Sequence, residues 1–334
     1  MLNIGVIGYG YWGPNIVRNF NAVKGARVVS LCDRDRKALA RARETSHNLE
    51  FFTDCRAITA SKDIDAVAIV TPVSTHFKLA KDALRNGKHV FIEKPFTSTA
   101  AQAQELIELA DKKNLKIMVD HTFLFTPAVR KIKDVVGGGK LGKLYYYDST
   151  RVNLGLFQHD VNVIWDLAPH DLSIMDYCIK ERPTGLVATG TRHFNSKLEN
   201  IAYITVYFSS NLIAHFNMNW LSPVKVRTTL IGGDRKMLVW NDLEIDEKIK
   251  IYDKGVKVRS AEGVYNLLVE YRSGDMWAPR IGHTEALKQE AEYFVSCVLN
   301  DKKPVNDGHS GLRIVKMLEA TDKSLKANSR MVKL

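Results

Sequence analysis

The sequence predicts an α/β protein of two domains. A doubly wound domain with a parallel sheet is expected over residues 1–121, and an α+β domain with a large, mostly antiparallel open sheet over residues 122–334. Three observations predict this class. The length of 334 residues exceeds what one hydrophobic core usually organises. Short apolar segments alternate with amphipathic ones up to about residue 121, and beyond it strand-like segments follow one another closely.

The first domain is built from short apolar strands separated by helices. Strands are predicted at Asn3–Gly8, Arg27–Cys32, Asp65–Val70, His89–Ile92 and Lys116–Asp120. The spacing of apolar residues predicts helices at Pro14–Ala22, Arg34–Ser46, Ser74–Asn86 and Thr99–Lys113. Strands that alternate with helices of this length form right-handed β-α-β units, which place the strands parallel in one sheet.

The second domain follows a different pattern, because most of its segments have strand length and lie at hairpin spacing. Strands are predicted at Lys143–Val152, Thr184–His193, Ala202–Phe208, Leu212–Trp220, Lys225–Ile231 and Lys236–Trp240. Helices are predicted at Pro127–Val136, about His170–Ile179, Glu285–Leu299 and Ser310–Ala327. Strands joined in this way indicate an antiparallel or mixed sheet.

The composition excludes several classes of protein. With 45% hydrophobic and 25% charged residues, the chain is neither disordered nor fibrous. No apolar run approaches the roughly 18 to 20 residues of a membrane helix. Strand-like sequence from Leu2 leaves no room for a signal peptide, and the four cysteines lack C-x-x-C spacing. We therefore expect a cytoplasmic protein without a membrane partner.

The net charge of +11 raises the possibility of nucleic-acid binding. The basic excess is spread over both domains, with no basic tail and no dense Lys/Arg block. A moderately positive field also suits an anionic small molecule. The sequence therefore predicts no nucleic-acid partner.

A glycine-rich turn follows the first predicted strand. Gly8, Gly10 and Gly13 fit the pattern G-x-G-x-x-G, and Asp33 ends the second strand 20 residues past Gly13. In such a turn the glycines permit a tight bend, a close approach to a pyrophosphate and close helix packing. The pyrophosphate then lies at a helix N-terminus. The variable positions, also expected to contact the cofactor, hold Tyr9, Tyr11 and Trp12.

Asp33 also predicts which dinucleotide binds. A carboxylate at this position accepts hydrogen bonds from the ribose hydroxyls and repels a 2′-phosphate. The neighbouring Arg34 could turn toward such a phosphate. We therefore predict NAD as the cofactor, with NADP as the alternative.

Two further motifs lie where predicted strands end, at the sheet edge where open α/β folds bind ligands. Thr71 and Pro72 are expected to line the pyrophosphate and ribose, whereas His76 is either a cofactor contact or a helix residue. Glu93 and Lys94 precede a proline with fixed φ, so that Lys94 projects over the sheet edge. Lys94 would favour a developing alkoxide there. The alternative is a surface lysine paired with Glu93.

These motifs together resemble the Gfo/Idh/MocA family, named for glucose–fructose oxidoreductase and inositol dehydrogenase. The resemblance covers the whole chain and rests on the glycine turn, the Thr71-Pro72 segment and Glu93-Lys94-Pro95. It implies a Rossmann domain followed by an α+β domain whose open sheet joins subunits into a homodimer or homotetramer. It further implies that Lys94 acts with Asp166 and His170, which match a D-x-x-x-H motif.

The bottom-up interpretation of Asp166 and His170 agrees with this. Residues four apart lie on one helical face, so the carboxylate can orient the imidazole and favour its protonated form. Imidazole titrates near neutral pH, as a proton acceptor for an alcohol should. Pro169 leaves open whether regular helix begins only there. A metal site is not expected, because the spacing of His159, Asp160 and His170 matches no metal motif.

The remaining candidates concern the cofactor ring and the substrate. His121 ends the last parallel strand, and Trp165 directly precedes Asp166. His121 and Trp165 are both expected to contact the cofactor. The segment from Asn153 to Asp171 resembles sugar-nucleotide members that act on UDP-N-acetylhexosamines. Candidate substrate ligands are Lys94, Arg151, Asn153, Asn162, Asp166 and His170. The arginines that could clamp a diphosphate are Arg151, Arg192, Arg227 and Arg280, and the sequence does not choose among them.

The function predicted from these residues is an NAD-dependent sugar dehydrogenase. His170 would take the proton from a ring hydroxyl, at C3, of a UDP- or dTDP-sugar such as UDP-N-acetylglucosamine. Lys94 would polarise that hydroxyl and Asp166 would hold the imidazole. The alternatives are an NADP-dependent 3-keto-sugar reductase, a free sugar or inositol dehydrogenase, and a dinucleotide-sensing protein without turnover.

Overall fold

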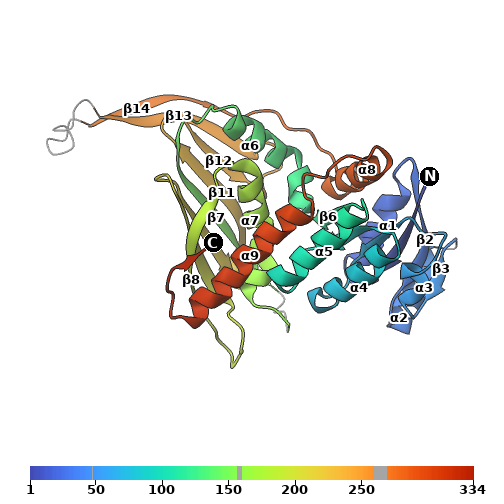
Figure 1. Cartoon of the computed structure of the whole chain (residues 1–334). Helices are drawn as coiled ribbons and strands as arrows, with labels where there is room; N and C mark the ends of the chain where they lie inside the picture. The colour runs from blue at the N-terminus through green and yellow to red at the C-terminus, as the bar shows by residue number, and fades with distance from the viewer. Residues whose placement is uncertain (47, 156–159, 259–268) are drawn as a thin grey trace. The chain divides into compact units, whose positions relative to one another are not determined.

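The computed structural model of the chain describes residues 1–46, 48–155, 160–258 and 269–334. The chain forms two compact units (Figure 1). Unit 1 contains Met1–Phe125 and Thr284–Lys316, and unit 2 contains Thr126–His283 and Met317–Leu334. The prediction placed everything after His121 in the second domain. Residues 284–316 instead pack with unit 1.

Unit 1 contains a six-stranded parallel sheet in the order β3-β2-β1-β4-β5-β6. Its strands are β1 (Leu2–Ile7), β2 (Ala26–Cys32), β3 (Glu50–Phe52), β4 (Ala66–Ile69), β5 (His89–Glu93) and β6 (Ile117–Asp120). Its helices are α1 (Gly13–Asn21), α2 (Arg36–Thr45), α3 (Arg56–Thr59), α4 (Val73–Arg85), α5 (Ala100–Lys112), the 3₁₀ turn η1 (Thr122–Phe125) and α8 (Ala286–Leu299). Helix α9 (Gly308–Lys326) begins in unit 1 and ends in unit 2. The strand order confirms the doubly wound prediction.

Aromatic packing explains why α8 belongs to unit 1. Phe294 of α8 meets Phe20 of α1 and Phe91 of β5, with ring centroids 5.9 and 5.6 Å apart in edge-to-face geometry. All three rings are fully buried. Such pairs add to the free energy gained from their buried area. The apolar face of α8 therefore completes the core of the parallel sheet.

Unit 2 contains a nine-stranded sheet in the order β14-β13-β12-β11-β7-β10-β9-β8-β15. Its strands are β7 (Leu144–Leu154), β8 (Pro183–Thr191), β9 (Ile201–Phe208), β10 (Ile213–Asn219), β11 (Leu221–Gly233), β12 (Met237–Asn241), β13 (Ile249–Val258), β14 (Val269–Trp277) and β15 (Val332–Lys333). All pairings are antiparallel except that of β10 with β7. Its helices are α6 (Pro127–Gly137), α7 (Val163–Cys178) and the second part of α9. The predicted mostly antiparallel sheet is confirmed.

The two faces of this sheet differ. Alternate residues such as Ala214, Phe216 and Met218 of β10 are fully buried, and α7 packs against β10, β7 and β9. The opposite face carries Tyr203 and Ile213, which are exposed. This alternation is that of a sheet with one face covered and the other left open by the described part of the chain.

Two differences from the predicted elements bear on the site. Helix α7 begins at Val163 instead of His170, with the Asn162 side chain capping it by accepting a hydrogen bond from the Trp165 N–H. Pro169 lies inside the helix. Strands β13 and β14 were not predicted, because their sequences mix charged and apolar residues without a clear period. In the described part of the chain, no helix is long and apolar enough to cross a membrane.

Candidate active site

The three glycines of the predicted phosphate turn each have a distinct structural role. Gly8 has φ of +103°, and a Cβ there would lie 2.3 Å from the Val70 carbonyl oxygen. A Cβ on Gly13 would lie 2.6 Å from the Gly8 carbonyl oxygen. A Cβ on Gly10 would meet nothing within 4 Å among the described atoms. Gly8 and Gly13 are therefore required by the backbone, whereas Gly10 faces open space of the kind that a pyrophosphate needs.

The turn leads directly into α1, whose first N–H groups are available to an anion. The N-cap residue Trp12 makes no side-chain capping bond, and Pro14 occupies the first turn. A helix N-terminus without a side-chain cap binds phosphate oxygens through its N–H donors and dipole. Tyr11 is 86% exposed beside it. The residues present therefore fit a dinucleotide pyrophosphate.

Asp33 is bonded to this turn. Its carboxylate accepts the Tyr9 N–H at 2.6 Å and the Asp35 N–H at 2.8 Å. Each carboxylate oxygen keeps a further lone pair that can accept from ribose hydroxyls. Asp33 is half-buried, and its neighbour Arg34 is exposed. The backbone thus fixes Asp33 in position, while Arg34 lies toward solvent.

The segment after β4 is tied to the segment after β5 by His76. This fully buried ring places Nε2 2.7 Å from the Thr71 carbonyl oxygen and Nδ1 3.0 Å from the Pro95 carbonyl oxygen. Burial lowers the pKa of His76. The Thr71 hydroxyl lies 2.7 Å from that of Thr75. His76 therefore connects two loops of the site, whereas Pro72 is exposed at its edge.

Glu93 ends β5 beside Asp120, which ends β6 in register with it. Both are buried, and the Glu93 carboxyl accepts the Lys94 N–H at 2.9 Å. Burial, and then the nearby Asp120, raise the pKa of Glu93 to about 8. Lys94 is half-buried and follows directly. A neutral carboxyl therefore adjoins the proposed catalytic lysine at neutral pH.

His121 follows β6 and is buried. Neither ring nitrogen has a hydrogen-bond partner among the residues that the structure describes. Burial, and then the charge of Lys94, lower the pKa of His121 to about 3, so the ring is neutral. Buried polar atoms without partners are rare and call for an explanation. A bound cofactor ring or amide would supply one.

The predicted cofactor residues of unit 1 thus meet at one edge of its sheet. Each follows or ends a different parallel strand, and the carboxyl ends of parallel strands share one edge. These residues are Gly8 after β1, Asp33 after β2, Thr71 after β4, Glu93 and Lys94 at β5, and His121 after β6.

In unit 2, Asp166 and His170 lie one turn apart on the continuous helix α7. The Trp220 indole donates a hydrogen bond to the Asp166 carboxylate at 3.1 Å. Both Asp166 and His170 are half-buried. The helix therefore provides the i,i+4 arrangement that Pro169 had left open.

Two of the predicted ligands are engaged within unit 2. Asn162 is buried, caps α7 and donates to Glu199 at 3.1 Å. The Trp165 indole donates to Asp322 at 3.0 Å. These contacts favour a structural role for both residues. Asn153 lies half-buried on β7.

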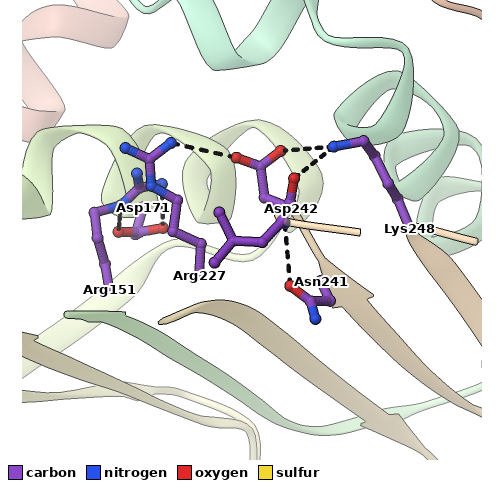
Figure 2. A network of polar contacts seen from close by, with 7 residues as sticks. Arg151, Asp171, Arg227, Asn241, Asp242 and Lys248 are labelled. Carbon is purple, nitrogen blue, oxygen red and sulfur yellow. Dashed lines mark hydrogen bonds and ion pairs between the residues drawn. The ribbon is translucent and has the colours of Figure 1, made fainter. Parts of the chain in front are cut away.

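Arg151 is the most constrained of the predicted substrate ligands. Figure 2 shows its guanidinium against the Asp171 carboxylate, with N–O distances of 2.6 and 3.1 Å. Both side chains are buried. Burial opposes the charge, but Asp171 raises the pKa of Arg151. This geometry favours holding α7 on β7 over binding a diphosphate.

The ion pair continues into a second group of charges. Arg227 of β11 is the register partner of Arg151 and lies 3.5 Å from Asp242, which also contacts Lys248 (Figure 2). Burial, and then Arg151, lower the pKa of Arg227. Sequence reasoning missed Asp171 and Asp242, because no local pattern links them to these arginines.

It also missed Glu290 of α8, which is fully buried near Asp120 and accepts the Asn306 side-chain amide at 2.8 Å. Asp120 carries a signal in retrospect, since it ends a predicted strand beside His121. Glu290 carries none, because its contact depends on how α8 packs. Among the described residues, no group of three or more His, Cys, Asp or Glu side chains is arranged to hold a metal.

Fold and site together define an oxidoreductase with a dinucleotide-binding domain. The family described as "Oxidoreductase family, NAD-binding Rossmann fold" matches residues 2–121, and its "GFO/IDH/MocA C-terminal domain" matches residues 129–239. The chain belongs to the Gfo/Idh/MocA family. This confirms the predicted resemblance, the class of enzyme and the NAD-binding fold.

Several characterised proteins are similar over almost the whole chain. UDP-N-acetylglucosamine 3-dehydrogenase of Acidithiobacillus ferrooxidans is 27% identical over 94% of each chain. The NAD(+)-dependent scyllo-inositol 2-dehydrogenase of Bacillus subtilis is 25% identical over 91% of this chain and 87% of its own.

Solved structures show the same fold. The Acidithiobacillus ferrooxidans enzyme superposes with a TM-score of 0.80 at 23% identity and covers 98% of both chains. Scyllo-inositol dehydrogenase of Lactobacillus casei, solved with bound NAD(H) and scyllo-inositol, gives 0.81 at 19% identity over 100% of this chain and 99% of its own.

Proposed function

We propose that the chain oxidises a ring hydroxyl, at C3, of a nucleotide sugar such as UDP-N-acetylglucosamine. The overall change converts a secondary alcohol and the oxidised cofactor into a ketone, the reduced cofactor and one proton. NAD, when bound, supplies the acceptor for the hydride. The observation that carries the proposal is the Asp166–His170 pair on α7, in a chain that also presents Lys94 at the cofactor edge of unit 1.

The residues divide the chemistry among them. His170 takes the hydroxyl proton, and Asp166 on the same helical face orients the imidazole and stabilises its charged form. Lys94 favours negative charge as it develops on the hydroxyl oxygen. The cofactor is held by the glycine turn, Asp33, Thr71, Pro72, Glu93 and His121.

The same geometry supports NAD over NADP. Asp33 is fixed by two backbone N–H groups, so its carboxylate stays where a 2′-phosphate would come. Arg34 is exposed and could approach that phosphate only by turning back toward it. Asp33 is therefore the residue that distinguishes the ribose 2′-hydroxyl of NAD from the 2′-phosphate of NADP.

Similarity supports a nucleotide sugar as the substrate. The likeness to UDP-N-acetylglucosamine 3-dehydrogenase extends over 94% of both chains, which includes the substrate domain. The scyllo-inositol relative, at 25% identity, keeps a free cyclitol as the second candidate. Since Arg151 is paired with Asp171, diphosphate recognition falls to other cations of unit 2.

We also propose that the chain assembles through the uncovered face of its nine-stranded sheet. That face carries Tyr203, Ile213 and Leu230, which are exposed and apolar on strands β9, β10 and β11. Apolar residues on an open sheet face are typical of a subunit interface. Light scattering at several concentrations would give the dimer or tetramer mass; a monomer at all concentrations would refute it.

The reaction is tested by incubating the protein with NAD and a panel of UDP-sugars, dTDP-sugars, glucose and inositols while following absorbance of the reduced cofactor. Turnover of UDP-N-acetylglucosamine or a close relative, with UDP as a salt-sensitive competitor, is the expected result. Turnover of inositol without UDP inhibition would establish the second candidate. Cofactor binding without turnover of any substrate would indicate a dinucleotide sensor.

A further inference from the structure

Charged side chains of unit 2 form a continuous network beside helix α7 (Figure 2). Its cations are Arg151, Arg227 and Lys248, and its carboxylates are Asp171 and Asp242. We call this group the charge network. Its three cations and two carboxylates leave one positive charge in excess.

The two arginines of the network are held differently. Arg151 meets Asp171 through two contacts, at 2.6 and 3.1 Å, and its side chain is 5% exposed. Arg227 lies 3.5 Å from Asp242, and its side chain is 33% exposed. Lys248 lies 3.7 Å from the same carboxylate. Asp242 is therefore shared between two cations, and the excess positive charge falls on Arg227 and Lys248.

The surroundings of the two guanidinium groups also act on them in opposite directions. Burial opposes the charge of Arg151, but Asp171 raises its pKa. Burial, and then the charge of Arg151, lower the pKa of Arg227, and Asp242 offsets them only in part. The charge on Arg227 therefore costs free energy in this structure, and an anion bound beside it would reduce that cost.

Sheet register places Arg227 near the helix that carries the proposed proton acceptor. Arg227 of β11 is the register partner of Arg151 on β7, so the two side chains lie on the same face of the sheet. Arg151 binds Asp171, which directly follows His170 on α7. Neighbouring strands lie about 5 Å apart. Arg227 is therefore one strand away from the residue that holds α7.

The proposed substrate carries its negative charge close to its reacting carbon. A UDP-sugar has the diphosphate on C1, two carbons from the C3 hydroxyl that is oxidised. The proton acceptor and the diphosphate ligand must then be separated by no more than about one sugar ring. A guanidinium presents N–H donors in a planar fork that matches phosphate oxygens. Arg227 offers such a fork, is half-buried, and lies on the strand next to the one that anchors α7.

We propose that Arg227 binds the diphosphate of the nucleotide-sugar substrate, with Asp242 holding the guanidinium in position. This inference rests on the proposed function, because a free sugar or cyclitol has no diphosphate. It selects one of the four arginines that the sequence left open. Arg151 is committed to a buried ion pair, and Arg192 and Arg280 are exposed.

The test measures the binding of UDP to the full chain by calorimetry. Arg227→Met should weaken UDP binding by roughly 10- to 100-fold, the loss expected for hydrogen bonds to a charged group. Arg227→Lys, which keeps the charge but not the planar fork, should have an intermediate affinity. Added salt should weaken UDP binding to the unmodified protein more than to Arg227→Met. Equal UDP affinity of Arg227→Met and the unmodified protein would overturn the proposal.

Lys248→Met is a matched control, because it removes the same charge from beside the same carboxylate. Without a direct contact to the diphosphate, this substitution should weaken UDP binding by less than about fivefold. An equal loss in Lys248→Met and Arg227→Met would mean that the excess charge alone attracts the ligand, which would overturn the proposal. Arg192→Met and Arg280→Met should leave UDP affinity unchanged. A loss as large as that of Arg227→Met in either of them would also overturn it.

Kinetics separate this role from a structural one. If Arg227 served only to hold the fold around Arg151, its loss would displace α7 and lower kcat through His170. As a diphosphate ligand, Arg227 should affect the KM. Arg227→Met should raise the KM for UDP-N-acetylglucosamine while kcat stays within about threefold. The unfolding midpoint and the NAD affinity should not change.

The outcomes also distinguish this inference from the proposed function. A fall in kcat at unchanged KM in Arg227→Met would overturn the inference and leave the substrate class standing. Failure of the unmodified protein to bind UDP would refute the nucleotide-sugar substrate, and with it the role of Arg227.

Discussion

The two units bury carboxyl groups in opposite ways. In unit 1, burial is the main cause that raises the pKa values of three neighbouring carboxyl groups, those of Glu93, Asp120 and Glu290, and the charge of Lys94 acts on the first two. In unit 2, Asp171 is as deeply buried but is neutralised by the two-point contact with Arg151. Proton-neutralised acids change charge with pH, whereas a guanidinium pair keeps its charge.

The contrast has a functional side. A group that titrates near neutral pH can follow a reaction that releases a proton and changes the charge of a cofactor. The ion pair instead fixes the position of a helix. Asp171 adjoins His170 on α7, so the Arg151–Asp171 pair holds in place the helix that carries the proposed proton acceptor. The carboxyl groups of unit 1 therefore have pKa values set by burial, whereas the ion pair of unit 2 fixes the position of a helix.

The largest expected effect comes from breaking the ion pair. Arg151→Met leaves the Asp171 carboxylate buried without its cation and should lower the free energy of unfolding of unit 2 by about 3 to 5 kcal/mol. Urea unfolding measures this. Arg151→Met with Asp171→Leu should recover most of the loss. Arg182→Met, which breaks the more exposed pair with Asp176, should cost less than about 1 kcal/mol. A similar loss of unfolding free energy in Arg151→Met and Arg182→Met would show that the buried ion pair contributes no more than the exposed one.

A substitution at the proposed proton acceptor on the same helix should change turnover without changing the stability of the fold. His170→Ala should reduce turnover by about 10²- to 10⁴-fold through loss of the proton acceptor, with the unfolding midpoint and NAD affinity little changed. Steady-state kinetics and thermal unfolding measure the two properties. Turnover near the original rate would mean that the proton leaves through Lys94 or water.

The buried carboxyl of Glu93 should make the free energy of unfolding of unit 1 depend on pH. The pKa of Glu93 is raised to about 8 in the folded protein, from an ordinary value of about 4.5. The contribution of Glu93 to the free energy of unfolding is therefore fully present below about pH 4.5. That contribution is lost as the pH rises to about 8, by at most about 1.4 kcal/mol for each pH unit. Glu93→Gln should flatten this part of the stability profile of unit 1. A profile unchanged by the substitution would place the titration elsewhere.

Asp33 provides a third case, a half-exposed carboxylate held by backbone N–H groups. Asp33→Ala should narrow the preference for NAD over NADP by roughly tenfold, because the repulsion of a 2′-phosphate is lost. Calorimetric titration of both cofactors measures it. Tighter binding of NADP by the unmodified protein would make Arg34 the residue that reads the ribose.

The smallest effect is expected at Glu290. Glu290→Gln replaces a protonated acid by a neutral amide of the same shape and should change stability by less than about 1 kcal/mol. Chemical unfolding at pH 7 measures it against Arg151→Gln, which should cost several times more because it removes a charge. Equal losses in the two variants would show that Glu290 is ionised, and the comparison of the two units would fail.

Local sequence determined the fold class and most of the cofactor edge. Gly8, Gly10, Gly13 and Asp33 stand at fixed spacings around one strand–turn–helix unit, so their positions at the sheet edge follow from spacing alone. The Asp166–His170 pair is equally local, although Asn162 rather than Pro169 sets where the helix starts. Periods of apolar residues likewise predicted the parallel strands.

Only the tertiary structure decided which charges are buried together. Glu290 lies 170 residues from Asp120 in the sequence and joins it only because Phe294 packs α8 onto the first core. Arg151 was expected at a substrate, but the sheet register and α7 set it against Asp171. Burial, partner and pKa arise from packing between distant segments, and no spacing along the chain records them. The sequence therefore supplied the residue types at the strand ends, while packing decided which of the titratable groups have shifted pKa values.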